Sequence, residues 1–237
     1  MNVRTLGHAV FLCTGLAAAL FLAGCTQTTG SHPVYHLPPA VDNIITTDQL
    51  NVLTGMGMTV NNGTTPPSVV GYYYTDALLL KGSNVPGDNG QIGIKTFADY
   101  SYKFSNQTAN GSISIDRTIA GGGSVAFGTG AIISGTGNDF SIFTDMTDSV
   151  ASDSVSPHII IFKSARVISG TYSAAGITNF RYAFICTAKE NDPYDEQLDV
   201  DQGRVIWESD SIASSVSIYP YAKRMSALAK PPDDIRR

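Results

Sequence analysis

The sequence predicts an all-β fold: mainly an antiparallel meander, barrel-like or strongly curled, with one short N-terminal helix. Beyond residue 58 apolar residues recur at every second position, as in strands with one buried face. Charged residues make up only 15% of the 237 residues, whereas the chain has 23 glycines, 11 tyrosines and 10 phenylalanines. That composition is typical of β-proteins. Consecutive short strands favour a meander that curls to remove its edges.

The first 24 residues have the layout of a secretory signal, with a basic start at Arg4 and an apolar stretch over 6–23. Leu22-Ala23-Gly24-Cys25 resembles the lipobox of bacterial lipoproteins. The resemblance implies cleavage after Gly24, diacylglycerol on the sulfur of Cys25 and acylation of its new amino group. Several acyl chains anchor a protein stably in a membrane. The alternative is an ordinary signal peptide or a single membrane span that ends in cysteine.

Thr26 follows the cysteine. By resemblance to proteobacterial sorting rules, a residue other than aspartate here implies the outer membrane. No acidic stretch occupies 26–31, the signal that sends some lipoproteins to the cell surface. We therefore expect a lipid-anchored protein of the outer membrane that faces the periplasm.

The remaining chain divides into three parts. Residues 25–45 are rich in Thr, Gly, Ser, His and Pro, and this composition predicts a lipidated flexible tether. His32 and His36 have helical metal-ligand spacing, but the prolines around them argue against a helix, so we expect solvated tether histidines. We expect residues 46–222 to form a single β-rich domain and 223–237 to form a polar, disordered tail.

One helix is expected between Thr46 and Met58. Thr46 or Thr47 caps it, Leu50 and Leu53 contribute to a partial apolar stripe with Val52, and the glycines at 55 and 57 end it.

The clearest strand spans 92–105, where Ile92, Ile94, Tyr100, Tyr102 and Phe104 share one face. Phe97 breaks this alternation, which indicates a bulge. The pair Asn110-Gly111 suits a hairpin turn and predicts a returning strand at 112–117. Further strands are expected at 69–80, 124–127, 131–134, 140–144, 158–168, 180–188, 204–208 and 216–219.

Three stretches carry a family resemblance. "GTTPPSVVGYYYTDALLL" (63–80), "ISGTGNDFSIF" (133–143) and "ARVISGTYSAAGITNFRYAFI" (165–185) resemble a group of uncharacterised Bacteroidetes-type envelope lipoproteins with a β-rich domain. Val70-Gly71-Tyr72-Tyr73 also resembles the Gly-x-Trp opening of lipocalins, with Tyr in place of Trp, which implies a calycin-like barrel. The group has no established activity, so the resemblance bears on fold and location.

The residues predict no disulfide and no enzyme. Cys13 leaves with the signal and Cys25 carries lipid, so Cys186 has no cysteine partner. Cys186 shares its alternation with Tyr182 and Phe184, which predicts burial. His158 is the only histidine outside the signal and tether, and no hydrolase, zinc or phosphate-loop motif accompanies it. A formal net charge of −5 without a basic cluster argues against nucleic acid.

Acidic residues gather in two segments. The first, 145–156, holds Asp145, Asp148 and Asp153. The second, 190–203, holds Glu190, Asp192, Asp195, Glu196, Asp199 and Asp201. Asp199-x-Asp201 is a fragment of calcium-ligand spacing, but the trailing glutamate of an EF-hand is missing. A solvated acidic loop explains the second segment equally well, so we predict no metal and no cofactor.

Two functions stay open, both non-enzymatic and both in the cell envelope. The first is a carrier or sensor of a small apolar ligand, which requires a cavity lined by the inward aromatic residues. The second is a structural or interaction module that presents its surface to an envelope protein or glycan, with a filled core and an exposed apolar patch.

Overall fold

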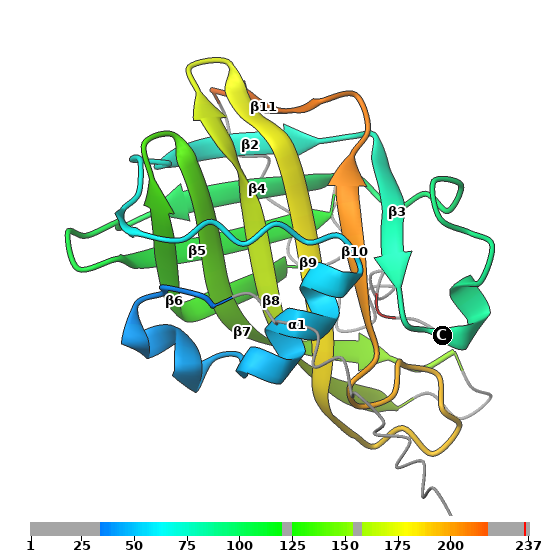
Figure 1. Cartoon of the computed structure of the whole chain (residues 1–237). Coiled ribbons are helices and arrows are strands. Elements are labelled where there is room, and N and C mark those ends of the chain that lie inside the picture. Colours follow the sequence, from blue (N-terminus) through cyan, green and yellow to red (C-terminus); the bar gives the residue numbers. More distant parts are fainter. Residues whose placement is uncertain (1–33, 120–124, 154–157, 218–234, 236–237) are drawn as a thin grey trace, which may run out of the picture. The chain divides into compact units, whose positions relative to one another are not determined.

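The computed structural model describes residues 34–119, 125–153, 158–217 and 235 (Figure 1). The predicted signal, the Cys25 anchor, His32 and nearly all of the predicted tail lie outside these residues. Within the described part of the chain, no helix is both long enough and apolar enough to cross a bilayer.

Eleven strands of the described chain join in one sheet. From β4 to β10 each strand pairs antiparallel with its neighbour in sequence, which confirms the predicted meander. The described elements are η1 (Pro39–Asn43), α1 (Thr47–Gly55), β1 (Thr64–Thr65), β2 (Gly71–Thr75), β3 (Leu78–Ser83), η2 (Pro86–Asp88), β4 (Tyr100–Ser105), β5 (Ser112–Ile119), β6 (Val125–Thr136), β7 (Asp139–Ala151), β8 (Ile159–Ser173), β9 (Gly176–Glu190), β10 (Gly203–Glu208) and β11 (Ile212–Val216).

The sheet curls into a ring because β9 has two partners on the same edge. Its first residues, Gly176 to Thr178, pair with β11, and residues from Arg181 to Ile185 pair with β10. Strand β11 also pairs with β2, which pairs with β4, so the ring closes (Figure 1). Strands β10 and β3 continue beyond this closure, and the arrangement is therefore a strongly curled sheet rather than a regular barrel.

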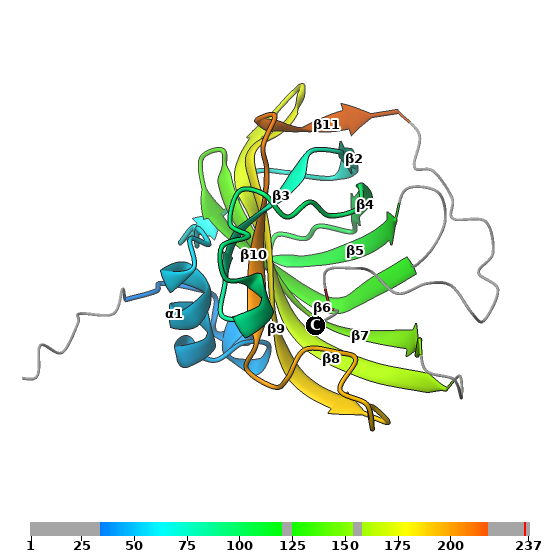
Figure 2. The ribbon, with the colours of Figure 1, turned by 90° about the vertical axis from the view of Figure 1, so that its right-hand side faces the viewer.

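Both faces of the central strands are buried. The concave face holds a large apolar cluster that includes Tyr102, Phe140 and Phe180. The convex face of β7 to β10 carries a second cluster, including Phe143 and Val167, which packs under α1. Figure 2 shows α1 on the side of the sheet away from the curl.

Helix α1 confirms the predicted helix and its cap. The side chain of Thr46 accepts the backbone N–H of Gln49 at 3.2 Å, and the Gln49 side chain accepts the backbone N–H of Thr46 at 3.0 Å. This reciprocal pair is a capping box. Val41 and Ile45 are also buried in the cluster under the helix. The packed domain therefore begins before Thr46 and includes part of the segment predicted as tether.

The predicted strand at 92–105 is correct only from Tyr100 to Ser105. Residues 92–99 form a loop, in which Ile92 and Ile94 are 59% and 67% exposed. Lys95 Nζ lies 2.5 Å from Asp88 Oδ1, and backbone hydrogen bonds within residues 88–95 close short turns. These local contacts outweigh the period-two pattern. Phe97 lies in this loop and its side chain is buried in the core, so it does not form the predicted strand bulge.

Other strands differ mainly in extent. The predicted strand at 69–80 is two strands, because the chain leaves the ring at Asp76 and β3 pairs with β10. Residues 125–127 and 131–134 belong to the single strand β6, with a register shift between Thr129 and Ile132, and 124 lies outside the described residues. The last strand is β11, which ends where the predicted 216–219 begins, and 218–219 lie outside the described residues. The hairpin after Asn110 is confirmed, with Gly111 at φ 83°.

Candidate functional site

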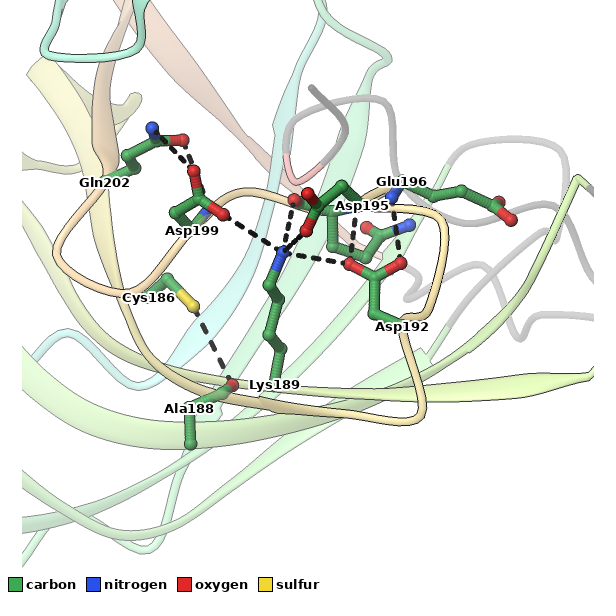
Figure 3. A network of polar contacts seen from close by, with 9 residues as sticks. Cys186, Ala188, Lys189, Asp192, Asp195, Glu196, Asp199 and Gln202 are labelled. Atoms are coloured by element: carbon green, nitrogen blue, oxygen red, sulfur yellow. Dashed lines mark hydrogen bonds and ion pairs between the residues drawn. The ribbon is translucent and has the colours of Figure 1, made fainter.

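Lys189 occupies the centre of the acidic loop between β9 and β10. Its Nζ lies 3.1 Å from Asp192 Oδ2, 2.9 Å from Asp195 Oδ1 and 3.1 Å from Asp199 Oδ1 (Figure 3). The ammonium also donates to the main-chain oxygen of Gln197 at 3.3 Å. We call residues 189–202 the lysine-centred loop.

The carboxylates of this loop also order its backbone. Asp192 accepts the N–H groups of Glu196 and Gln197 at 2.8 and 3.1 Å. The Asp199 N–H donates to the side chain of Gln202 at 3.1 Å, and Gln202 Nε2 donates back to Asp199 at 3.2 Å. The loop is therefore held by a network of ion pairs and hydrogen bonds, although the side chain of Asp195 remains 62% exposed.

Within this loop a lysine ammonium lies among the carboxylates. Burial opposes the charge of Lys189, but hydrogen bonds to Asp195, Asp199 and Asp192 outweigh it and raise the lysine pKa. The ammonium thus supplies the positive charge that a metal ion would bring. Asp201, the partner of Asp199 in the expected calcium spacing, is outside this network: its side chain is exposed and its N–H donates to the Cys186 carbonyl at 2.9 Å.

The other acidic segment splits between the two faces of β7. Asp145 is exposed, whereas Asp148 is buried inside the ring. Asp148 pairs with Arg166, and its Oδ1 lies 3.8 Å from Nη2 of Arg117. Asp153 joins the lysine-centred loop through its backbone N–H, which donates to Glu196 Oε2 at 2.6 Å.

Two buried arginines lie at the centre of the ring. Arg117 and Arg166 are 2% and 0% exposed. Arg117 Nη1 donates to the Tyr182 hydroxyl at 2.7 Å, and Arg166 Nε donates to Ser164 Oγ at 2.8 Å. With Asp148, these four residues form what we call the ring-interior cluster, which links β5, β7, β8 and β9. The alternation of the two strands places Arg117 and Arg166 at inward positions, and this pattern could have predicted the cluster. The cluster is not among the sequence-based predictions.

Aromatic rings fill the space around this cluster. Ring centroids lie 5.4 Å apart for Tyr102 and Phe180, 6.3 Å for Tyr100 and Tyr182, and 6.0 Å for Tyr182 and Phe184. The Arg117 guanidinium carbon lies 4.7 Å from the centroid of the Tyr100 ring. None of these aromatic side chains is more than 1% exposed, so they contact protein rather than a solvent-sized cavity.

The remaining candidate residues have structural environments. Cys186 is buried, as predicted, and burial raises the pKa of its thiol to about 12. His158 Nδ1 lies 3.1 Å from Ser152 Oγ where β7 and β8 diverge, and the Ser152 N–H donates to the His158 carbonyl. This pair therefore closes a hairpin. His36 is exposed.

Two exposed apolar side chains project from the lysine-centred loop itself. Tyr194 and Val200, both in that loop, are 64% and 50% exposed. Asn84 Nδ2 donates to the Asp201 carbonyl at 2.8 Å, which joins the loop to the segment that leads into η2. A hollow of about 320 Å³ lies there, lined by Val85, Pro86, Gly87 and Gln202.

Comparisons with known protein families, with curated proteins and with solved structures find no match to this chain. The resemblance to Bacteroidetes-type envelope lipoproteins therefore stays a prediction.

Proposed function

We propose that the chain is a lipid-anchored outer-membrane protein whose filled β-domain binds another envelope protein through its rigid loop surface, without enzymatic activity. The observation that carries this proposal is the burial of the described inward side chains, which pack against one another inside the ring. A filled scaffold offers its outside, not its inside, to a partner.

The interior counts against the alternative of an apolar carrier. Binding pockets for small molecules usually enclose about 300–1,000 Å³. Four aromatic side chains that would line such a pocket, Tyr73, Tyr102, Phe162 and Phe184, are at most 2% exposed. A ligand in the centre would also have to separate Arg166 from Asp148, and an unpaired buried charge costs several kcal/mol.

The lysine-centred loop supports the outer surface as the binding site. Its internal ion pairs and hydrogen bonds hold the backbone, which lowers the entropy lost on binding. Tyr194 and Val200 project from it. Aromatic side chains are enriched in protein interfaces, and an exposed apolar group on a rigid loop favours a protein partner over a glycan.

The anchor part of the proposal rests on Leu22-Ala23-Gly24-Cys25 and the basic start before it. Replacement of Cys25 by alanine, or treatment of cells with globomycin, should release the protein from the membrane fraction. Retention of the Cys25→Ala protein in the outer membrane would contradict lipid anchoring.

A site-specific photo-crosslinker tests the binding surface in the native host. We expect a crosslinker at Tyr194 or Val200 to give one discrete protein adduct. The matched control is exposed Thr65, at the short strand β1, where we expect no adduct. Absence of an adduct at both loop positions, equal labelling at Thr65, or a glycan adduct would contradict the proposal.

A further inference from the structure

Three carboxylates converge where the β2–β3 connection meets the end of β10. Asp76 lies in the connection, Glu208 is the last residue of β10, and Asp210 follows two residues later. One carboxylate oxygen of each residue lies within 4.8 Å of those of the other two. Asp76 and Asp210 are exposed, whereas Glu208 is only 1% exposed.

Hydrogen bonds fix the two loops against each other. The Ala77 N–H donates to Glu208 Oε1 at 2.8 Å. The N–H and hydroxyl of Ser209 both donate to the Ala77 carbonyl, at 3.0 and 2.7 Å. Asp210 Oδ1 accepts the N–H of Ile212 at 3.2 Å. The second oxygen of Glu208, Oε2, is buried and has no hydrogen-bond partner among the described residues.

The lack of a basic partner separates Glu208 from Asp88, Asp148 and Asp192, three other carboxylates with buried side chains; Glu196 Oε1 is a second buried carboxylate oxygen without a hydrogen-bond partner among the described residues. Asp88 pairs with Arg204 and Lys95, Asp148 with Arg166 and Arg117, and Asp192 with Lys189. Glu208 has no Lys, Arg or His partner within the residues that the structure describes. Two further carboxylates beside it increase the unfavourable charge. Burial, with smaller contributions from Asp210 and Asp76, raises the pKa of Glu208 to about 7.

We infer that Asp76, Glu208 and Asp210 bind a calcium ion at this junction. Calcium takes six to eight oxygen ligands at about 2.3–2.6 Å in flexible geometry, so two ligand oxygens on one ion lie up to about 5 Å apart. The three carboxylates meet this limit. Water completes the coordination on the open side formed by Asp76 and Asp210. Magnesium, with shorter bonds and a strict octahedron, fits this spacing less well.

The site is distinct from the calcium fragment suggested by Asp199 and Asp201. There a lysine ammonium neutralises the carboxylates, whereas at the junction no basic side chain among the described residues does so. Bound calcium would pair the buried oxygen of Glu208 and join the β2–β3 connection to the end of β10.

Calcium titration of the detergent-solubilised full chain, stripped with EDTA and held at pH 8, tests the inference by calorimetry and thermal unfolding. We expect one saturable site and a rise in Tm with calcium. Glu208→Gln keeps the acceptor for Ala77 and should weaken binding at least about tenfold, as should Asp210→Asn at an exposed position. Without calcium, Glu208→Gln should melt above the wild type, because it removes repulsion; this readout also verifies that it folds.

Asp199→Asn in the lysine-centred loop is the matched control and should leave calcium affinity unchanged. Absence of a heat signal and of a Tm shift up to about 10 mM calcium would overturn the inference, since even weak extracellular calcium modules bind below that level. An equal loss in Asp199→Asn, unchanged binding in both junction variants, or an equal affinity for magnesium would also overturn it.

Discussion

Replacement of Lys189 by methionine removes the ammonium from three carboxylates at once while keeping an apolar stem of similar length. The side chains of Asp195 and Asp199 are 62% and 39% exposed, so their ion pairs contribute at most about 1 kcal/mol each. Asp192 is 2% exposed, and loss of the partner of a buried charge costs about 3–5 kcal/mol. Two backbone N–H groups still donate to Asp192 in the variant, so the loss should lie at the lower end of this range of about 3–5 kcal/mol. We expect a net loss of about 3 kcal/mol.

Urea denaturation followed by tryptophan fluorescence measures this loss. The matched control is Lys163→Met on the neighbouring strand, because Lys163 and Glu190 form one exposed pair with side chains 44% and 59% exposed. That change should cost less than about 1 kcal/mol. Adding Asp192→Asn to Lys189→Met should restore part of the stability. If Lys189→Met and Lys163→Met were equally mild, the lysine would not hold the loop together.

Four further outcomes follow from buried groups. Asp148→Asn should lower the unfolding free energy measured in urea by about 3–5 kcal/mol, because it removes the buried carboxylate that pairs with Arg166; a loss below about 1 kcal/mol would contradict the ring-interior cluster. Burial opposes ionisation of Asp88, but hydrogen bonds from Arg204 and Lys95 lower its pKa from 3.8 to about 2. About 2 kcal/mol of unfolding free energy that is present above pH 3.8 should therefore disappear as the pH falls through 2. Asp88→Asn should abolish this pH dependence. Burial raises the pKa of Glu208 from 4.5 to about 7. The unfolding free energy of the calcium-free protein should therefore fall by about 3 kcal/mol as the pH rises between these two values. An unfolding free energy that does not change over this pH range would refute the burial of the Glu208 charge. Cys186 should react with a thiol reagent at pH 8 only in denaturant, and rapid labelling of the folded protein would show that its strand face is open.

Local signals account for what the sequence predicted correctly. The Thr46–Gln49 cap, the turn at Gly111 and the alternation that buries Cys186 each depend on residues close together in the chain. Strand order in a meander is also predictable from local signals, since strands that follow one another in the sequence are neighbours in the sheet.

The candidate sites depend on contacts that separation in sequence conceals. Asp76 and Glu208 meet because β3 leaves the ring and pairs with β10. The acidic composition of 190–203 is visible in the sequence, but the ion pairs inside the loop are not. They form because Lys189, the last basic residue of β9, turns towards the loop and pairs with Asp192. The alternation of Ile92 and Ile94 was misleading, since the ion pair between Lys95 and Asp88 holds that segment in turns.

Native mass spectrometry of the protein extracted from its own envelope tests the central claim, a lipid-anchored scaffold with a filled interior. We predict a chain that begins at Cys25 and carries covalent acyl groups, with no apolar small molecule released on activation in the gas phase. A chain without acyl groups, or one that releases a stoichiometric apolar guest, would contradict the account.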